Sequence, residues 1–204
     1  AQMLKPIFLE IVMAPSFAPD ALELLCTKKN LRVLKVDMSK DNTVRKQYVS
    51  MNGGMLVQDR DINTKPVSAE QCVTEAKPTA EQLADLEFAW KIVKHVKSNA
   101  IVVAKNGMTY GVGAGQMNRI GSAEIALKQA QATLKEEGKD IMTEGLVLAS
   151  DGFFPFNDCV ALAAEYGIKA IVQPGGSIRD EDSVKLADEK GITMLFTGER
   201  HFKH

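Results

Sequence analysis

The sequence is poor in the features that would assign it to a specialised class of protein. Its 204 residues include only three cysteines, Cys26, Cys72 and Cys159, which are far apart and form no CxxC pair. This usage excludes a disulfide scaffold and predicts reduced thiols in a cytoplasmic protein. No apolar run approaches the roughly 20 residues that a membrane-spanning helix needs. Residues 1–5 resemble neither an initiator-methionine start nor a signal peptide, so we expect further chain upstream.

Charge of one sign is also not in excess. Lys and Arg total 25 and Asp and Glu total 26, which gives a formal net charge of −1. Such a balance exerts no general attraction on nucleic acid or a membrane surface, so we expect neither as a partner. Any anion that the protein binds must therefore be held by a local site. With 45% apolar and 25% charged residues, the chain has the composition of a globular protein, which excludes disorder and collagen-like structure.

The last third of the chain alternates between two kinds of pattern. Short apolar runs predict strands at 146–148, 168–172 and 192–196, and amphipathic stretches predict helices at 157–166 and 181–190. Strands that alternate with helices of this length are typical of a parallel or mixed sheet covered by helices. The fold class predicted is α/β.

The first third is less regular. The apolar run 7–13 predicts a buried strand, a helix is expected from Pro19, and 31–36 predicts the next strand. Beyond these the periodicity is poor, with short strands expected at 55–57 and 71–74. At this length the chain holds one full-sized α/β domain or a pair of small ones.

The middle third contains two strong local signals. Residues 79–82 form a capping box, with Thr at the first position and Gln at the fourth, and predict the start of a long helix. Residues 105–107, Lys-Asn-Gly, predict a hairpin turn between strands at 100–104 and 108–112. A helix at about 122–135 is expected to follow.

The glycine-rich stretch 111–116 stands between a strand and a helix. Its spacing departs from the dinucleotide-binding pattern GxGxxG, because Gln116 stands where a glycine is needed. We expect the glycines to allow close approach of the backbone before Arg119, a cation that could hold a phosphate or a carboxylate. A surface arginine at the start of a helix is an equally good interpretation.

Three of the eight phenylalanines lie at 153–156, in a connection between a strand and a helix. Aromatic faces there could stack on a planar heterocycle while Asp158 accepts hydrogen bonds from it, or they could form a hydrophobic plug. The turn 173–177, Gln-Pro-Gly-Gly-Ser, could present amides to a ligand or be a plain turn. His201 and His204 lack a third ligand at suitable spacing, and the zinc deaminase signature is absent, so we expect no zinc.

Together, these stretches resemble the bifunctional purine-biosynthesis family that combines phosphoribosylaminoimidazolecarboxamide (AICAR) formyltransferase with IMP cyclohydrolase. The resemblance runs through the whole chain in order, in the segments 7–15, 97–102, 104–107, 111–119, 151–156, 173–177 and 200–204. It is a resemblance to the C-terminal half of the formyltransferase portion. It implies that 1–204 is one part of that domain, with the other half of the transferase and the cyclohydrolase domain outside this chain.

The resemblance implies a cytidine-deaminase-like α/β/α subdomain with a mixed sheet. It also implies an enzyme that transfers the formyl group of 10-formyltetrahydrofolate to AICAR. The partners implied are the AICAR nucleotide, a reduced folate and a second copy, in a homodimer with active sites at the subunit interface. The alternative that remains is a non-catalytic module that binds a nucleotide or a folate.

The resemblance also implies roles for individual residues. Asn99, Arg119 and Phe153 would hold the base of AICAR and its carboxamide, with Asn99 orienting the reacting group. Arg200 and Lys29 would contact the nucleotide, with Lys29 at its phosphate. The residues implied for the folate site are Ile120, Asp158, Ser177 and Ile178.

Two further implications concern ions and protons. A structural potassium ion would lie near Asp151 and Ser98. The Lys-His pair that the family uses for proton transfer would lie upstream of this chain. The neighbours Lys94 and His95 stand in a different context, on the predicted long helix, and are not that pair. We therefore expect this chain alone to be inactive in formyl transfer.

Overall fold

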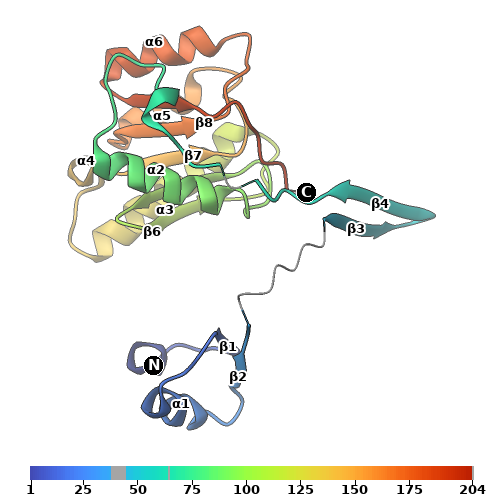
Figure 1. Cartoon of the computed structure of the whole chain (residues 1–204). Helices are drawn as coiled ribbons and strands as arrows, with labels where there is room; N and C mark the ends of the chain where they lie inside the picture. Colours follow the sequence, from blue (N-terminus) through green and yellow to red (C-terminus); the bar gives the residue numbers. More distant parts are fainter. Residues whose placement is uncertain (38–44, 64, 204) are drawn as a thin grey trace. The chain divides into compact units, whose positions relative to one another are not determined.

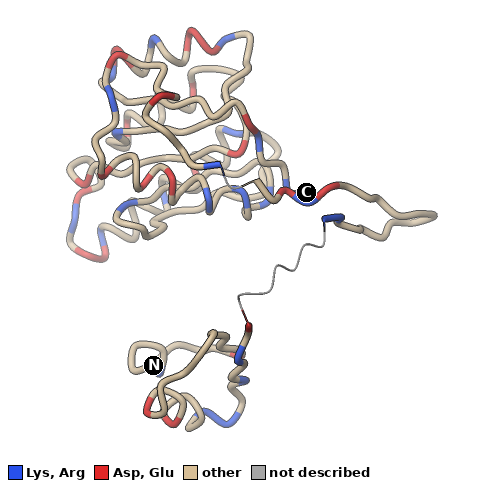
Figure 2. Tube along the Cα trace, viewed as in Figure 1, with Lys and Arg blue, Asp and Glu red and all other residues tan. Residues whose placement is uncertain are grey.

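The computed structural model describes residues 1–37, 45–63 and 65–203. They form two compact units, Ala1–Arg60 and Asp61–His204. His204, one of the two histidines considered for a metal, lies outside the described residues. Charged residues of both signs occur in both units (Figure 2).

The larger unit is built on a mixed five-stranded sheet. Its strands are β5 (Ile101–Lys105), β6 (Met108–Gly113), β7 (Val147–Ser150), β8 (Ala170–Gln173) and β9 (Thr193–Phe196). The spatial order is β6-β5-β7-β8-β9. Strand β5 runs antiparallel to both β6 and β7, whereas β7, β8 and β9 are parallel to one another.

Helices cover both faces of this sheet (Figure 1). They are α2 (Ala80–Val93), α3 (Arg119–Glu136), α4 (Ile141–Glu144), α5 (Asp158–Glu165) and α6 (Asp180–Lys190). Alternate strand residues point to opposite faces. Ile101, Val103 and Leu148 pack in the cluster with α3 and α5, while Val102 and Ala149 pack in the cluster with α2. This arrangement confirms the predicted α/β fold with a mixed sheet covered by helices.

The local signals in this unit also hold. Thr79 accepts a hydrogen bond from the Gln82 amide while the Gln82 side chain accepts from the Thr79 amide, so the capping box is complete. Asn106 and Gly107 both have positive φ values, 52° and 66°, as a tight hairpin turn requires. Instead of the short strand expected at 71–74, there are a 3₁₀ turn, η2 (Ala69–Gln71), and a single bridge from Cys72 to β9.

The smaller unit contains two separate strand pairs. Strands β1 (Ile11–Ala14) and β2 (Arg32–Lys35) are parallel and are connected through helix α1 (Pro19–Cys26), after a 3₁₀ turn, η1 (Gln2–Leu4). Strands β3 (Lys46–Met51) and β4 (Gly54–Asp59) form an antiparallel hairpin.

The prediction of a buried strand at 7–13 was wrong in two respects. The strand is shorter, and its residues Ile11 and Met13 are 48% and 65% exposed. A parallel strand becomes buried only when helices or further strands cover both of its faces. Two strands and one helix are too few to do so. None of the helices in the described ranges has the length and the apolar character needed to cross a bilayer.

Candidate functional site

The register of the larger sheet brings several strand ends to one edge. Ile101, the first residue of β5, lies opposite Ser150, the last residue of β7, and opposite Gly113, the last residue of β6. The parallel strands β8 and β9 end at the same edge as β7. Ligands of open α/β sheets bind outside the carboxyl ends of the strands. The segments 98–100 and 150–153 therefore meet where a ligand would be expected.

Arg119 is the buried cation of this edge. It opens helix α3, where Asn118 caps the helix by accepting a hydrogen bond from the Gly121 amide. Its guanidinium Nη1 donates to the Ser150 hydroxyl at 2.9 Å and to the Asp151 carboxylate, and Nη2 donates to Asn99 Oδ1 at 3.0 Å. The side chain of Arg119 is 7% exposed and that of Asp151 is fully buried. These bonds use three of the five N–H donors of a guanidinium, so the group keeps donors for a ligand.

Asn99 is fixed by its own set of bonds. Its side-chain Nδ2 donates to the Gln116 carbonyl at 2.9 Å, and its main-chain carbonyl accepts from the Ser122 hydroxyl at 2.7 Å. With Arg119 on its Oδ1, the amide plane is held from two sides. An amide that is held in this way can orient a reacting group without having to be ordered first.

Asp151 was expected beside a potassium ion together with Ser98. Its Oδ1 accepts from Arg119 and from the Ala100 amide, at 3.1 Å for the latter, and its Oδ2 accepts from the Ser98 hydroxyl. A cation at these oxygens would also face the guanidinium, which carries a charge of the same sign. The residues therefore do not fit a potassium ion as they stand, and potassium carries no step in the function proposed below.

The side chains that could bind a metal ion are dispersed in the described residues. In the described ranges 1–37, 45–63 and 65–203, no three His, Cys, Asp or Glu side chains gather in a way that could hold a metal ion. His95 is exposed after the end of α2, as a helix-surface histidine would be. Burial and the neighbouring Lys94 lower the pKa of His95.

Two glycines make the close packing of this edge possible. A Cβ on Gly113 would lie 1.9 Å from the Ser122 carbonyl oxygen, so a side chain there would push α3 away from the sheet. A Cβ on Gly152 would lie 2.4 Å from Nη2 of Arg119. The expectation that glycines allow close approach before Arg119 is confirmed for Gly113.

The C-terminal segment, residues 199–203, lies against the same edge. The His201 amide donates to the Asp151 carbonyl at 2.9 Å, and the Ser98 amide donates to the Lys203 carbonyl at 2.9 Å. Arg200, the residue before His201, is exposed, and its guanidinium lies 5.0 Å from the ring centre of Phe202. The structure thus brings Arg200 into the neighbourhood of Arg119 and Asn99 by way of the main chain.

The remaining predicted residues of the larger unit lie in the loops after β7 and β8, at the start of α5 and in the first turn of α3. Half-buried Phe153 follows Gly152 directly, and Phe154, not Phe153, is the fully buried phenylalanine that acts as a plug. Asp158 begins α5, and its carboxylate accepts from the Cys159 amide at 2.8 Å. The side chain of Ile120 is half-buried against the core beneath.

The loop after β8 meets the loop after β7 through a cation–π contact. Arg179 lies 5.0 Å from the ring centre of Phe156. Ser177 accepts from the Arg179 amide at 3.1 Å, and Ile178 is fully exposed. The turn 173–177 therefore belongs to the same edge.

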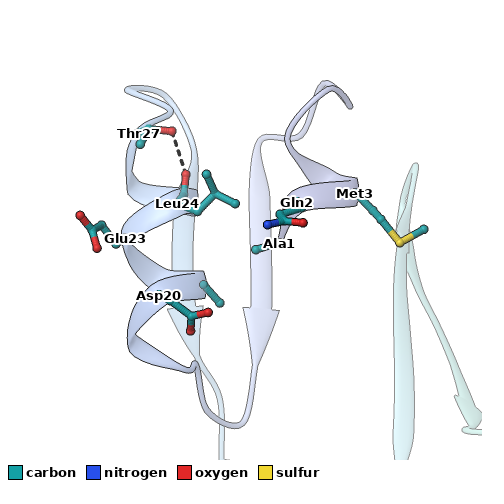
Figure 3. Close-up of a pocket in the computed structure, with 8 residues that line it drawn as sticks. Ala1, Gln2, Met3, Asp20, Glu23, Leu24 and Thr27 are labelled. Carbon is teal, nitrogen blue, oxygen red and sulfur yellow. Dashed lines mark hydrogen bonds between the residues drawn. The ribbon is translucent and has the colours of Figure 1, made fainter.

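Lys29 lies in the smaller unit. It is exposed and lines a pocket of about 440 Å³ together with Arg32 and Glu10. A second pocket in that unit, of about 710 Å³, is lined among others by Asp20, Glu23 and Leu24 (Figure 3). None of the site residues predicted from the sequence lines this second pocket.

Two features were missed by the sequence analysis. Ser150 accepts from Arg119 and donates to the Gly152 carbonyl at 2.7 Å, and its place beside Asp151 at the end of a strand could have indicated it. His201 is buried and hydrogen bonded to Asp61. No sequence signal connects two residues that are so far apart in the chain.

Comparisons with known proteins agree with the resemblance. The chain is 57% identical over its full length to the bifunctional purine biosynthesis protein PurH of Anoxybacillus flavithermus, and it covers 38% of that protein. It is 56% identical to PurH of Lactobacillus delbrueckii subsp. bulgaricus, again over the whole chain and 39% of the relative. The chain therefore spans less than half the length of these curated relatives.

Among solved structures, a dCMP deaminase from the cyanophage S-TIM5 is similar over 53% of this chain and 90% of that chain. The identity is 17% and the TM-score is 0.34, so nothing about activity follows from it. The family model described as AICARFT/IMPCHase bienzyme matches residues 1–129. With this match and with relatives above 50% identity along its whole length, the chain belongs to the AICARFT/IMPCHase bienzyme family.

Proposed function

We propose that this chain is the C-terminal half of the formyltransferase portion of its family. In this function the protein transfers the formyl group of 10-formyltetrahydrofolate to the amine of AICAR in purine biosynthesis. The observation that carries the proposal is the buried network of Arg119, Asn99 and Asp151 at the carboxyl ends of the strands. Family membership supports it.

The chemistry calls for orientation more than for a strong nucleophile. The lone pair of the AICAR amine is delocalised toward the neighbouring carboxamide, so the amine attacks poorly. Holding the amine and the formyl carbon in line lowers the activation free energy, by up to about 7–11 kcal/mol in well-oriented systems. Arg119 and Asn99 suit the carboxamide, because they present fixed N–H donors and an amide at one point.

The other groups divide between the two substrates. Phe153 would stack on the imidazole, and Arg200 and Lys29 would bind the nucleotide. The folate would lie along the loops after β7 and β8 and the first turn of α3, against the side chains of Ile120, Asp158, Ser177 and Ile178. We place the reaction in the cytoplasm and in a homodimer whose second copy helps to form each active site.

Proton transfer is the part that this chain does not supply. The Lys-His pair that the resemblance implies would lie upstream, and His201, which is buried and bonded to Asp61, is not proposed in its place. A positioned acid or base typically contributes about 10²–10⁴-fold. We therefore expect the full-length protein to transfer formyl groups and this 204-residue chain alone to be inactive.

The test uses the full-length protein and replaces Arg119 by Lys, which keeps the charge and loses the planar fork. We expect kcat/KM to fall by about 10²-fold, since a misplacement of about 1 Å can have that effect. Arg45→Ala, at an exposed arginine of the smaller unit, is the control and should not change the rate. Unchanged kcat/KM in Arg119→Lys would refute the proposed site. If the full-length protein binds nucleotide or folate but transfers no formyl group, the non-catalytic alternative is favoured.

A further inference from the structure

His201 is the buried side chain of an otherwise exposed segment. It is 3% exposed, and its ring lies 4.5 Å from that of Trp90 on α2, at an interplanar angle of 53°. Its Nδ1 is hydrogen bonded to the Asp61 carboxylate, which can only accept, so Nδ1 is the donor. Within the described residues 199–203, no other side chain is buried. Among the side chains of residues 199–203, the imidazole is therefore the one that is anchored inside the unit.

Asp61 is itself fixed by the end of helix α2. The Lys94 ammonium lies 4.0 Å from Asp61 Oδ1 and donates to the Asn63 carbonyl at 2.6 Å. The Asn63 amide in turn donates to Asp61 Oδ1 at 3.2 Å. These bonds set the position of the carboxylate before the imidazole meets it. The pair thus connects α2 to the C-terminal segment.

The segment lies beside the Arg119 site, the network of Arg119 with Asn99, Ser150 and Asp151. The His201 amide donates to the Asp151 carbonyl, and the Lys203 amide donates to the Ser98 hydroxyl at 3.2 Å. Asp151 pairs directly with Arg119, and Ser98 donates to the other carboxylate oxygen of Asp151. A Cβ on Gly152 would lie 3.0 Å from the Phe202 ring, which shows how closely this segment approaches the loop after β7.

A second ion pair reaches the same segment but differs in exposure. Lys65 bonds to Glu199, and its side chain is 77% exposed. Exposed ion pairs of this kind contribute little to stability, because water and salt screen them. By contrast, a buried imidazole N–H that loses its acceptor keeps its full desolvation cost. The position of the segment should therefore depend on Asp61 and not on Lys65.

We propose that Asp61 and His201 are positioning residues, which act by fixing the C-terminal segment, and with it Arg200, beside the Arg119 site. What that site binds rests on the function proposed above, whereas the positioning itself does not. Neither residue touches the reacting atoms in this role. Their effect on a ligand passes through the main-chain bonds of His201 to Asp151 and of Lys203 to Ser98.

The first test is hydrogen exchange of the full-length protein, followed by mass spectrometry. In Asp61→Ala we expect exchange in the peptides that contain the His201 and Ser98 amides to rise roughly 10- to 100-fold, the range expected for a lost hydrogen bond to a charged group. Amides of α3 should keep their native exchange. Lys65→Ala is the matched control, because it removes the exposed pair on the same segment. Native exchange at His201 in Asp61→Ala would overturn the proposal.

A gentler variant covers the case in which Asp61→Ala loosens the whole unit. Asp61→Asn keeps an acceptor oxygen and loses the charge, so we expect a smaller rise that is confined to the same two peptides. A rise spread evenly over the sheet in both variants would refute positioning, because the pair would then be a general stabilising element.

Steady-state kinetics separate positioning from fold. We expect Asp61→Asn to raise the KM for the nucleotide by about tenfold or more with kcat little changed, the pattern of lost uniform binding. A lower kcat at native KM would contradict the proposal. If the native protein shows no formyl transfer at all, the function fails, and the exchange experiment still decides the positioning.

Discussion

Gly152 offers the sharpest test of the geometry at the strand ends. A Cβ at this position would lie 2.4 Å from Nη2 and 3.1 Å from Cζ of Arg119, and 3.0 Å from the ring of Phe202. The φ of Gly152 is not in the left-handed region, so alanine brings no backbone strain. Gly152→Ala therefore isolates a steric effect on one guanidinium.

The guanidinium cannot move aside freely. Its bonds to Ser150, Asp151 and Asn99 hold it on three sides. Ordinary contact begins at about 3.4 Å, so Nη2 must retreat by roughly 1 Å from its present 2.4 Å. A shift of that size lengthens the 3.0 Å bond to Asn99 or weakens the ion pair with Asp151. Overpacking of this kind typically costs about 1–3 kcal/mol.

These numbers predict two effects of Gly152→Ala. The midpoint of thermal unfolding should fall by roughly 2–12 °C, at about 2–4 °C per kcal/mol for a protein of this size. Formyl transfer by the full-length protein should fall by about 10²-fold, because the orienting group moves by about 1 Å. Circular dichroism measures the first effect and the transfer assay the second.

Gly54→Ala provides the control, because a Cβ on Gly54 meets nothing within 4 Å. It should leave the unfolding midpoint unchanged or slightly raised. A Gly152→Ala protein with native midpoint and native rate would show that Arg119 is not held as described, and the reasoning from its network would fail. A lower midpoint with a native rate would separate the network from the reaction.

Three further predictions concern single groups. Burial raises the pKa of the Cys159 thiol to about 12, so iodoacetamide at pH 8 should label exposed Cys26 and leave Cys159 unmodified in the native protein; equal labelling of both would contradict the fold. Thr79→Ala removes the acceptor for the Gln82 amide and should cost about 1 kcal/mol in chemical denaturation, and no loss would mean that the cap is not formed. Burial lowers the pKa of His95 below its usual 6.5, so the unfolded state binds the proton more readily and stability should fall as the pH drops through about 6.5; His95→Gln should make the unfolding midpoint less sensitive to pH there.

The sequence predicted best where a signal is local. The capping box at 79–82 and the turn at 105–107 depend on a few neighbouring residues, and both formed as expected. The four-residue helix α4 is too short to show a period, and the polar residues of β3 hid its strand character. Both elements were missed for that reason.

The site was predicted in part for a similar reason. Family resemblance pointed to Arg119, Asn99 and Asp151, but not to the bonds among them, because those depend on strand register across the sheet. It implied a potassium ion near Asp151 and Ser98, and gave no sign of the buried pair that Asp151 forms with Arg119. Asp61 had no local pattern at all, since its partner His201 is contributed by the other end of the unit.

The pairing of Arg119 with Asp151 bears on how the proposed site divides its work. The two charges cancel within a buried pair, so Arg119 offers a ligand directed N–H donors but little net positive charge. Such a group suits a neutral carboxamide oxygen, whose position it can set, better than a phosphate dianion. Attraction of the phosphate must then come from cations that remain exposed, and Arg200 is one that the C-terminal segment brings to this edge. Under the proposed function, orientation and charge attraction thus reside in different residues. Replacing Arg200 should therefore reduce the salt dependence of nucleotide binding as well as its affinity, whereas replacing Arg119 should leave the salt dependence unchanged.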